Sequence, residues 1–351
     1  SVTTYFGQKK KHKQREMLRI KKYEEHLAQK VQEIEEKREE QIGAVTMSNP
    51  SVQDCLDTVY HIKRELWERK PGDNDFMSIR LGEGCAEFNM NIRIPKVGIV
   101  LDEDNLIGKP GEIKNTYEMI DNFPILLDMV QNNMCGIIGN RNESLKLLRN
   151  MLIQVTSHHC YDDVKIVTVY DRKEESHFKW IKWLPHSFDD NKEMRYMADD
   201  VFSAGRLFKF MEELLSQRVR ELDEEKSLSS SMKLPYYLFV ITDRKFIEEQ
   251  TINQYLALNR PELGIGTMFV FDDLGMLPKE CSVIIEAGRQ QNVIYNKENI
   301  SEKQIFSIEN ISDAVFHKYS RSMLPIKTDI GAEEALLPQC VTFLEGYGVR
   351  R

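Results

Sequence analysis

No apolar run in this sequence approaches the roughly 18 residues that a membrane-spanning helix needs. Cysteines are few and scattered, and no CxxC pair occurs among them, which excludes a clustered zinc site and a disulfide framework. Widely spaced cysteines of this kind favour buried, reduced thiols. The six residues are Cys55, Cys85, Cys135, Cys160, Cys281 and Cys340.

The motifs of common hydrolases are also missing. The sequence contains no GxSxG, no HExxH and no Cys/His nucleophile spacing, and we assign no catalytic residue and no metal ligand from such motifs. Its eight histidines are dispersed, and Trp183 and Pro185 beside His186 predict packing rather than catalysis. A net charge of -8 over 351 residues argues against a nucleic-acid binder, which needs a strongly basic face.

Proline and glycine are absent from residues 8–42, which predicts one long helix. Its charge is segregated, because eight Lys/Arg lie between Lys9 and Lys22 whereas seven Glu lie between Tyr23 and Glu40. A narrow apolar stripe follows helical spacing and is wide enough for one partner helix. The stripe consists of Ile20, Tyr23, Leu27, Val31 and Ile34.

Two interpretations of this helix stay open. It is either a solvated helix or a juxtamembrane stalk, whose basic cluster would mark the cytoplasmic side of a membrane span. The sequence begins abruptly at Ser1 without an initiator Met. We therefore expect a piece of a longer protein, and this expectation favours the stalk.

Residues 49–110 predict a helix followed by short strands. The helix is expected from about Asn49, which can act as its cap. Strands are expected over Met77–Leu81 and Glu87–Ile94, with a turn at Gly82–Gly84 between them. Apolar and polar residues alternate in the second segment, which is typical of a half-buried antiparallel strand.

From about Gly111 the pattern changes to continuous apolar strands separated by helices, which is typical of a mostly parallel sheet covered on both faces. We therefore predict an α/β fold, preceded by a helical stalk and a few antiparallel strands. The expected strands are Ile125–Leu127, Cys135–Ile138, Val164–Val169, Tyr236–Thr242, Gly266–Phe271, Val283–Ile285 and Val293–Tyr295. The expected helices are Asn142–Ser157, Asn191–Leu222, Arg244–Leu258 and Ile311–Leu324.

The stretch CGIIGNRNESLKLLRNML has the layout of a phosphate-binding loop: a buried strand, a turn at Gly139 and an amphipathic helix. In such a loop a lysine neutralises the β- and γ-phosphates, and the next hydroxyl holds Mg²⁺. Leu145 and Lys146 occupy these two places, Ser144 replaces the second glycine, and Glu143 adds a negative charge. A competent nucleotide site, residual anion binding and an ordinary strand–helix corner are the three alternatives.

The stretch YYLFVITDR is the candidate partner of this loop. It ends at Asp243, the position at which active P-loop enzymes contact Mg²⁺ through water, and then at Arg244. A glutamate that polarises the attacking water commonly follows the aspartate, and arginine cannot replace it. Either the metal-side aspartate survives without its general base, or Asp243 is a helix N-cap.

Taken together, several stretches resemble the membrane-bound ATPases of type VII secretion, the EssC/EccC family of FtsK/SpoIIIE-type motors. The resemblance covers nearly the whole chain, and as a set the stretches are specific. They are LWERKPGDNDFMSIRLGEG (Leu66–Gly84), PILLDMVQNNMCGIIGNR (Pro124–Arg141), WIKWLPHS (Trp180–Ser187), GTMFVFDDLGMLPKECSVIIE (Gly266–Glu286), YSRSMLPIK (Tyr319–Lys327) and LPQCVTFLEGYGV (Leu337–Val349).

This resemblance implies a P-loop NTPase fold of the RecA/FtsK type and identifies the chain with the first, membrane-proximal module of the family, which is generally degenerate. It locates a vestigial nucleotide site but transfers no catalytic role and no metal ligand. No cofactor is expected in this fragment, since ATP and Mg²⁺ belong to the later modules of the parent protein. The vestigial loop comprises Gly139, Asn140, Arg141, Asn142, Glu143, Ser144, Leu145 and Lys146, and the vestigial Walker B comprises Asp243 and Arg244.

The resemblance also implies a division into four parts and a cellular place. The parts are a juxtamembrane stalk (1–48), a helix and β-strand region (49–110), a degenerate ATPase-like domain (111–330) and a linker to the next module (331–351). The expected place is the cytoplasmic face of the bacterial cell membrane, reached through spans outside this sequence. Expected partners are other membrane components of the secretion machine, the downstream ATPase modules and further copies in a hexamer, without nucleic acid.

The function expected from the resemblance is a non-hydrolysing module that couples the membrane channel to downstream ATPase modules, which drive export of small helical WXG-type proteins. A regulatory or active nucleotide-binding module is one alternative. Part of an FtsK-like DNA translocase is another, and the net charge of -8 argues against it.

Overall fold

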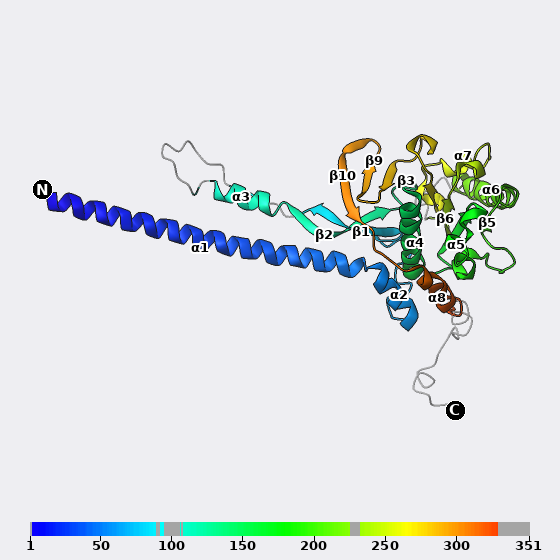
Figure 1. Cartoon of the computed structure of the whole chain (residues 1–351), viewed down its shortest axis with the longest axis horizontal. Coiled ribbons are helices and arrows are strands. Elements are labelled where there is room, and N and C mark those ends of the chain that lie inside the picture. Colours follow the sequence, from blue (N-terminus) through cyan, green and yellow to red (C-terminus); the bar gives the residue numbers. More distant parts are fainter. Residues whose placement is uncertain (1, 89–91, 95–105, 107, 225–231, 329–351) are drawn as a thin grey trace, which may run out of the picture. The chain divides into compact units, whose positions relative to one another are not determined.

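The structure, a computed structural model, describes residues 2–88, 92–94, 106, 108–224 and 232–328 (Figure 1). The chain divides into two compact units, each of which is described by itself. Unit 1 is drawn from Ser1–Asp54, Met77–Gln154 and Phe269–Asn310, and unit 2 from Cys55–Phe76, Val155–Met268 and Ile311–Arg351. The predicted linker over 331–351 lies outside the described residues.

The strands of unit 1 are mostly antiparallel and follow the order β2-β1-β10-β9-β8-β3. Only β3 and β8 of this set pair in parallel, whereas β1 pairs antiparallel with β2 and β10, and β9 pairs antiparallel with β8 and β10. Their bounds are β1 (Ser78–Glu87), β2 (Met119–Asp128), β3 (Met134–Gly139), β8 (Val283–Ala287), β9 (Asn292–Asn296) and β10 (Asn299–Ser307).

The strands of unit 2 follow the order β7-β6-β4-β5, and β4 is parallel to both β5 and β6. Every residue of β4, β6 and β7 is buried, so both faces of these strands are covered, as continuous apolar runs predict. Their bounds are β4 (Val164–Val169), β5 (Met197–Ala198), β6 (Tyr236–Ile241) and β7 (Ile265–Val270).

Eight α-helices accompany these strands within the described residues. They are α1 (Val2–Ser48), α2 (Val52–His61), α3 (Lys109–Thr116), α4 (Arg141–His158), α5 (Glu175–Phe178), α6 (Val201–Glu224), α7 (Asn253–Leu256) and α8 (Asp313–Met323). In the part of the chain that is described, none of them is both long and apolar enough to cross a membrane. Four cysteines are buried and outside any disulfide, as predicted: Cys55, Cys135, Cys160 and Cys281.

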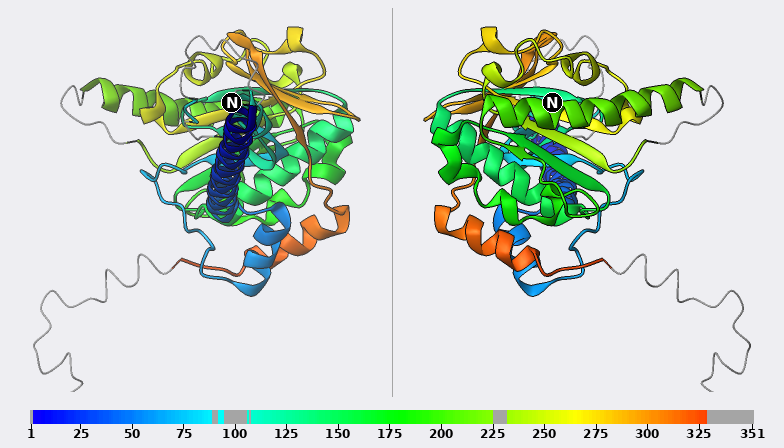
Figure 2. Two further views of the ribbon diagram at one scale, coloured as in Figure 1. Left: turned by 90° about the vertical axis from the view of Figure 1, so that its left-hand side faces the viewer. Right: turned by 90° about the vertical axis from the view of Figure 1, so that its right-hand side faces the viewer.

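The predicted N-terminal helix is present and longer than expected, since α1 runs without a break to Ser48 (Figures 1 and 2). Its apolar stripe is partly covered by other segments of unit 1. Ile34 is buried in a small core with Phe88 and Ile120. Alongside, Lys109 Nζ lies 2.7 Å from a Glu24 carboxylate oxygen, so the start of α3 lies beside α1. The C-terminal part of the stripe therefore has a partner within the chain.

The turn predicted at Gly82–Gly84 is wrong, because β1 continues through these glycines to Glu87. Glycine is required here because β10 lies too close for a side chain. A Cβ on Gly82 would lie 1.9 Å from the Ser307 carbonyl oxygen. The strand predicted over Glu87–Ile94 is also wrong where it can be checked, since Phe88 and residues 92–94 lie outside any strand and 89–91 lie outside the described residues.

Two predicted helices are shorter in the structure. The helix expected from Asn191 begins only at Val201, because the Asp200 carboxylate accepts a 2.9 Å hydrogen bond from the Ser203 N–H and starts it there. The helix expected over Arg244–Leu258 is a 3₁₀ turn, η4 (Arg244–Phe246), followed by the single turn of α7. Short helical turns replace long helices in this part of unit 2.

Candidate functional site

The corner between β3 and α4 has the predicted strand–turn–helix layout. β3 ends at Gly139 and α4 begins at Arg141, so Asn140 alone connects them. Gly139 has a φ of +108°, and a Cβ there would lie 2.6 Å from the Ala287 carbonyl oxygen. Both the backbone conformation and the close approach of β8 require glycine at this residue.

The first N–H groups of α4 are bonded within the protein. The Asn140 side-chain oxygen accepts a hydrogen bond from the Glu143 N–H at 3.3 Å, and its carbonyl accepts from the Ser144 N–H at 2.9 Å. Asn140 is therefore the N-cap of a helix that already includes residues 141–144. In a phosphate-binding loop these residues would wrap around the anion and aim their N–H groups at it.

At the three key positions of the loop, the side chains are buried or paired within the protein. Ser144 and Leu145 are 1% and 2% exposed, and Ser144 Oγ has no hydrogen-bond partner among the described residues. The Lys146 side chain is 23% exposed and its Nζ lies 3.6 Å from a Glu143 carboxylate oxygen. The place that needs a phosphate-binding lysine thus holds a leucine in the core, and the one lysine nearby is paired with an acid.

The other two loop residues lie apart from any catalytic arrangement. Arg141 donates a 2.7 Å hydrogen bond from Nη1 to the carbonyl of Val270, which also belongs to unit 1. Asn142 is exposed. Among the described residues, no group of three or more His, Cys, Asp or Glu side chains is placed to hold a metal ion.

A surface pocket of about 540 Å³ lies beside the first turn of α4. Glu143 and Lys146 line it from α4, Glu83 lines it from β1, and Arg289 lines it from the turn between β8 and β9. Two carboxylates and two cations line it, so the formal charges of its side chains balance. Gly139, Ser144 and Leu145 are not among its lining residues. Two of the eight predicted loop residues therefore face this pocket.

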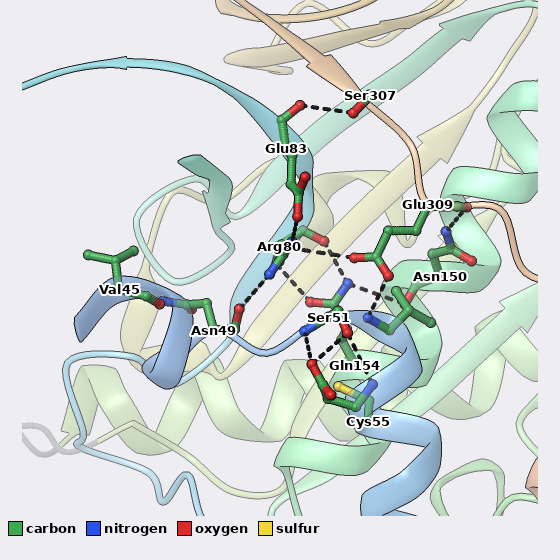
Figure 3. Close-up of polar contacts among 12 residues, drawn as sticks. Val45, Asn49, Ser51, Cys55, Arg80, Glu83, Asn150, Gln154, Ser307 and Glu309 are labelled. Carbon is green, nitrogen blue, oxygen red and sulfur yellow. Dashed lines mark hydrogen bonds and ion pairs between the residues drawn. The ribbon is translucent and has the colours of Figure 1, made fainter. Parts of the chain in front are cut away.

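A polar cluster around Arg80 of β1 was not predicted (Figure 3). The Arg80 side chain is 3% exposed and makes three contacts. Its Nη1 donates to the Asn49 carbonyl at 2.9 Å, its Nη2 donates to Glu83 Oε1 at 2.7 Å, and its Nε lies 3.6 Å from Glu309 Oε1. A single guanidinium thus contacts the end of α1, its own strand and the segment after β10.

Glu309 is, with Glu83, one of two carboxylates that contact Arg80 in this cluster. Its Oε2 accepts a 2.9 Å hydrogen bond from the Val52 N–H at the start of α2. Its carbonyl accepts a 2.8 Å bond from the Asn150 side chain on α4. Burial raises the pKa of the Glu309 carboxyl, and the Arg80 guanidinium opposes this shift only in part, since the 3.6 Å separation is too long for a hydrogen bond.

Sequence reasoning missed Arg80 and Glu309 because no motif contains them. One signal was available: Arg80 stands in an otherwise apolar stretch of β1, between Ile79 and Leu81, and a charged residue in such a place needs a partner. The sequence offered no way to identify that partner, which comes from a distant segment.

Asp243 and Arg244, the second part of the predicted vestigial site, belong to unit 2. The Asp243 side chain accepts a 2.9 Å hydrogen bond from the Lys245 N–H, so it caps η4. Its other oxygen lies 3.2 Å from Lys245 Nζ, which also contacts Asp171. Arg244 pairs with Glu248 at 3.4 Å. Within unit 2 the Asp243 carboxylate therefore acts as a cap and an ion-pair partner.

Comparisons with known proteins identify relatives along the whole sequence. The chain is 26% identical to the type VII secretion system protein EssC of Staphylococcus aureus, in an alignment that covers 99% of the chain. It is 24% identical to the ESX secretion system protein EccC of Geobacillus thermodenitrificans, and that alignment covers 100% of the chain. The chain spans 24% of the length of these curated relatives. No protein-family model matches it.

The fold has a counterpart among solved structures. The cytoplasmic domain of the type VII secretion ATPase EccC from Thermomonospora curvata superposes with a TM-score of 0.51 and 11% identity, over 80% of this chain and 35% of that one. The predicted α/β fold class, with its N-terminal helix and additional antiparallel strands, is confirmed. Along its length the chain is thus a homologue of the type VII secretion proteins EssC and EccC.

Proposed function

We propose that this chain is a non-hydrolysing, ATPase-like module of a type VII secretion motor, which couples the membrane channel to downstream ATPase modules that drive export of small helical WXG-type proteins. The observation that carries the proposal is the β3–α4 corner. Asn140 caps α4 there, and Leu145 lies in the core at the position where a phosphate-binding loop needs its lysine.

The second predicted part of the site, Asp243 and Arg244, also lacks a group that hydrolysis requires. A hydrolysing module needs a group that polarises the attacking water, and Arg244 stands at that position. Asp243, which would contact Mg²⁺ through water, is engaged with the Lys245 N–H and ammonium groups. We therefore assign no catalytic residue and no cofactor to this chain, and we assign ATP and Mg²⁺ to later modules of the parent protein.

The long helix α1 supports the connection to the membrane. Its N-terminal part carries the basic residues between Lys9 and Lys22, and clusters of this kind are favoured next to anionic cytoplasmic membrane surfaces. We propose that α1 is a juxtamembrane stalk at the cytoplasmic face of the membrane. The partners of the module would then be other membrane components of the secretion machine, the downstream modules of its own chain and further copies in a hexamer.

The proposal is tested by titrating the chain with a fluorescent ATP analogue, with and without Mg²⁺, and by an assay of phosphate release. We expect no saturable binding up to about millimolar nucleotide, since that concentration detects affinities as weak as about -4 kcal/mol. ATP hydrolysis that disappears in the Asp243→Ala variant would overturn the proposal. An ATPase with an intact phosphate-binding loop serves as the positive control.

The pocket beside α4 favours one second function, a regulatory nucleotide-binding module. Lys146 and Arg289 line it, and its volume of about 540 Å³ is within the range of small-molecule sites. This alternative predicts saturable binding without hydrolysis, weakened by Lys146→Ala. Binding that Lys146→Ala leaves unchanged would reject the pocket as the nucleotide site.

A further inference from the structure

Four segments that are far apart in the sequence meet at the Arg80–Glu309 pair in unit 1 (Figure 3). The first is the α1–α2 corner, where Asn49 ends α1 by donating from its N–H and its side-chain amide to the Val45 carbonyl. The second is β1 with Arg80, the third is α4, and the fourth is the segment with Glu309. The Arg80 side chain is 3% exposed and that of Glu309 is 21% exposed, so the contacts of the pair are largely shielded from water.

The corner is held from both sides by charged groups. Arg80 Nη1 bonds the Asn49 carbonyl at the end of α1, and the Glu309 carboxylate bonds the Val52 N–H at the start of α2. Hydrogen bonds to charged groups are stronger than neutral ones, and here they satisfy backbone groups that a helix end leaves open. Within unit 1, the direction of α1 at its C-terminal end is therefore set by this pair.

The same pair is tied to α4. Gln154 Oε1 accepts from the Arg80 N–H at 3.0 Å, and Gln154 Nε2 donates to the Arg80 carbonyl at 2.6 Å. One turn earlier, Asn150 bonds the Glu309 carbonyl. Any displacement of α4 thus acts on both members of the ion pair through its own side chains.

Glu83 extends this connection to the surface. Its carboxylate bonds Arg80 Nη2, and the same residue lines the pocket together with Glu143 and Lys146 from the first turn of α4. Gln154 on α4 thus contacts Arg80 directly, and the first turn of α4 lines the same pocket as Glu83, which bonds Arg80.

We infer that Arg80 and Glu309 are positioning residues, which hold α1 in a fixed direction relative to α4 and so transmit displacements between the stalk and the ATPase-like core. This inference rests on the proposed coupling function, and it identifies the residues through which that coupling would act. The apolar stripe of α1 holds the helix against β2 and α3, whereas the ion pair fixes its end.

The test measures the distance between spin labels on unnatural amino acids placed at Ala28 on α1 and Asn142 on α4, which are both exposed. The 351-residue chain should give one narrow distance distribution. Arg80→Leu should lose this single narrow peak, because the Asn49 carbonyl and Glu309 lose their partner. The matched control is Arg172→Leu, which removes an exposed arginine paired with Asp199 in unit 2 and should leave the peak unchanged.

A double variant distinguishes a role of the pair in orienting α1 from a role in folding. Arg80→Leu with Glu309→Leu replaces both members of the largely shielded ion pair by apolar side chains, a change that commonly preserves folding. We expect it to melt near the wild-type temperature, and yet to lose the narrow peak and to exchange the Val52 amide hydrogen about tenfold faster. A folded double variant that keeps the narrow peak would overturn the inference, while nucleotide hydrolysis would overturn only the proposed function.

Discussion

Gln154 on α4 exchanges two hydrogen bonds with the backbone of Arg80 on β1, at 3.0 Å to the N–H and 2.6 Å to the carbonyl. β1 pairs with β10 at Glu83 and Gly84, and within the part of the chain that the structure describes this pairing does not reach Arg80. One side-chain amide takes the place of a neighbouring strand there. Unsatisfied backbone groups in the interior are costly, which makes Gln154 a structural requirement.

Gln154→Leu should lower the free energy of unfolding by about 2–4 kcal/mol, because it leaves a buried N–H and a buried carbonyl without partners. Leucine has a similar volume, so the change isolates the hydrogen bonds. Chemical denaturation followed by circular dichroism measures it. Gln217→Leu, at an exposed residue of α6 that bonds Glu221, is the control and should change stability by less than about 0.5 kcal/mol.

Gly139→Ala should destabilise the protein by about 2–4 kcal/mol, since it adds a Cβ at positive φ and 2.6 Å from the Ala287 carbonyl oxygen. Gly205→Ala in α6 provides the opposite case. No atom lies within 4 Å of its added Cβ, and alanine in a helix should raise stability by about 0.5–1 kcal/mol. Equal effects of the two substitutions would contradict the requirement for glycine at the β3–α4 corner.

Leu145→Lys, which restores the lysine of a phosphate-binding loop, should destabilise the protein by about 3 kcal/mol or more, because it places an unpaired charge at a buried residue. Lys146→Ala is the neighbouring control and should cost less than about 1 kcal/mol, since it removes a partly exposed pair with Glu143. Thermal melts of the two variants at pH 7 compare them. A stable Leu145→Lys variant would mean that the lysine side chain can reach solvent from this position.

The sequence predicts those parts of the fold whose signals are local. The apolar run before Gly139, the glycine itself and the amphipathic helix after it are adjacent, and the structure has them in that order. β10 could not be predicted, because its residues are mostly polar and exposed and show no apolar period. The Arg80–Glu309 pair could not be predicted either, since it joins two distant segments and its burial depends on the finished fold.

Two histidines of unit 2 make its stability depend on pH. Burial lowers the pKa of His159 and of His186 to about 3. His186 donates from Nε2 to the His159 carbonyl at 2.8 Å, and its Nδ1 is buried without a hydrogen-bond partner among the described residues. Protonation would place a charge at that nitrogen, so the folded protein keeps the ring neutral. The packing role predicted for His186 agrees with this geometry.

His186→Gln should make the protein less sensitive to acid. The pKa of His186 in the folded protein is below the value of about 6.5 for an unfolded chain. The contribution of the neutral ring to the free energy of unfolding is therefore fully present above pH 6.5 and is lost as pH falls towards 3. Glutamine retains an N–H donor for the His159 carbonyl but cannot take up a proton. Between about pH 6 and 4, the slope of unfolding free energy against pH should fall by about 1.4 kcal/mol per pH unit relative to wild type. Urea denaturation at several pH values measures the slope, with His26→Gln on the exposed face of α1 as the control. Identical slopes for wild type and His186→Gln would contradict a neutral, buried His186.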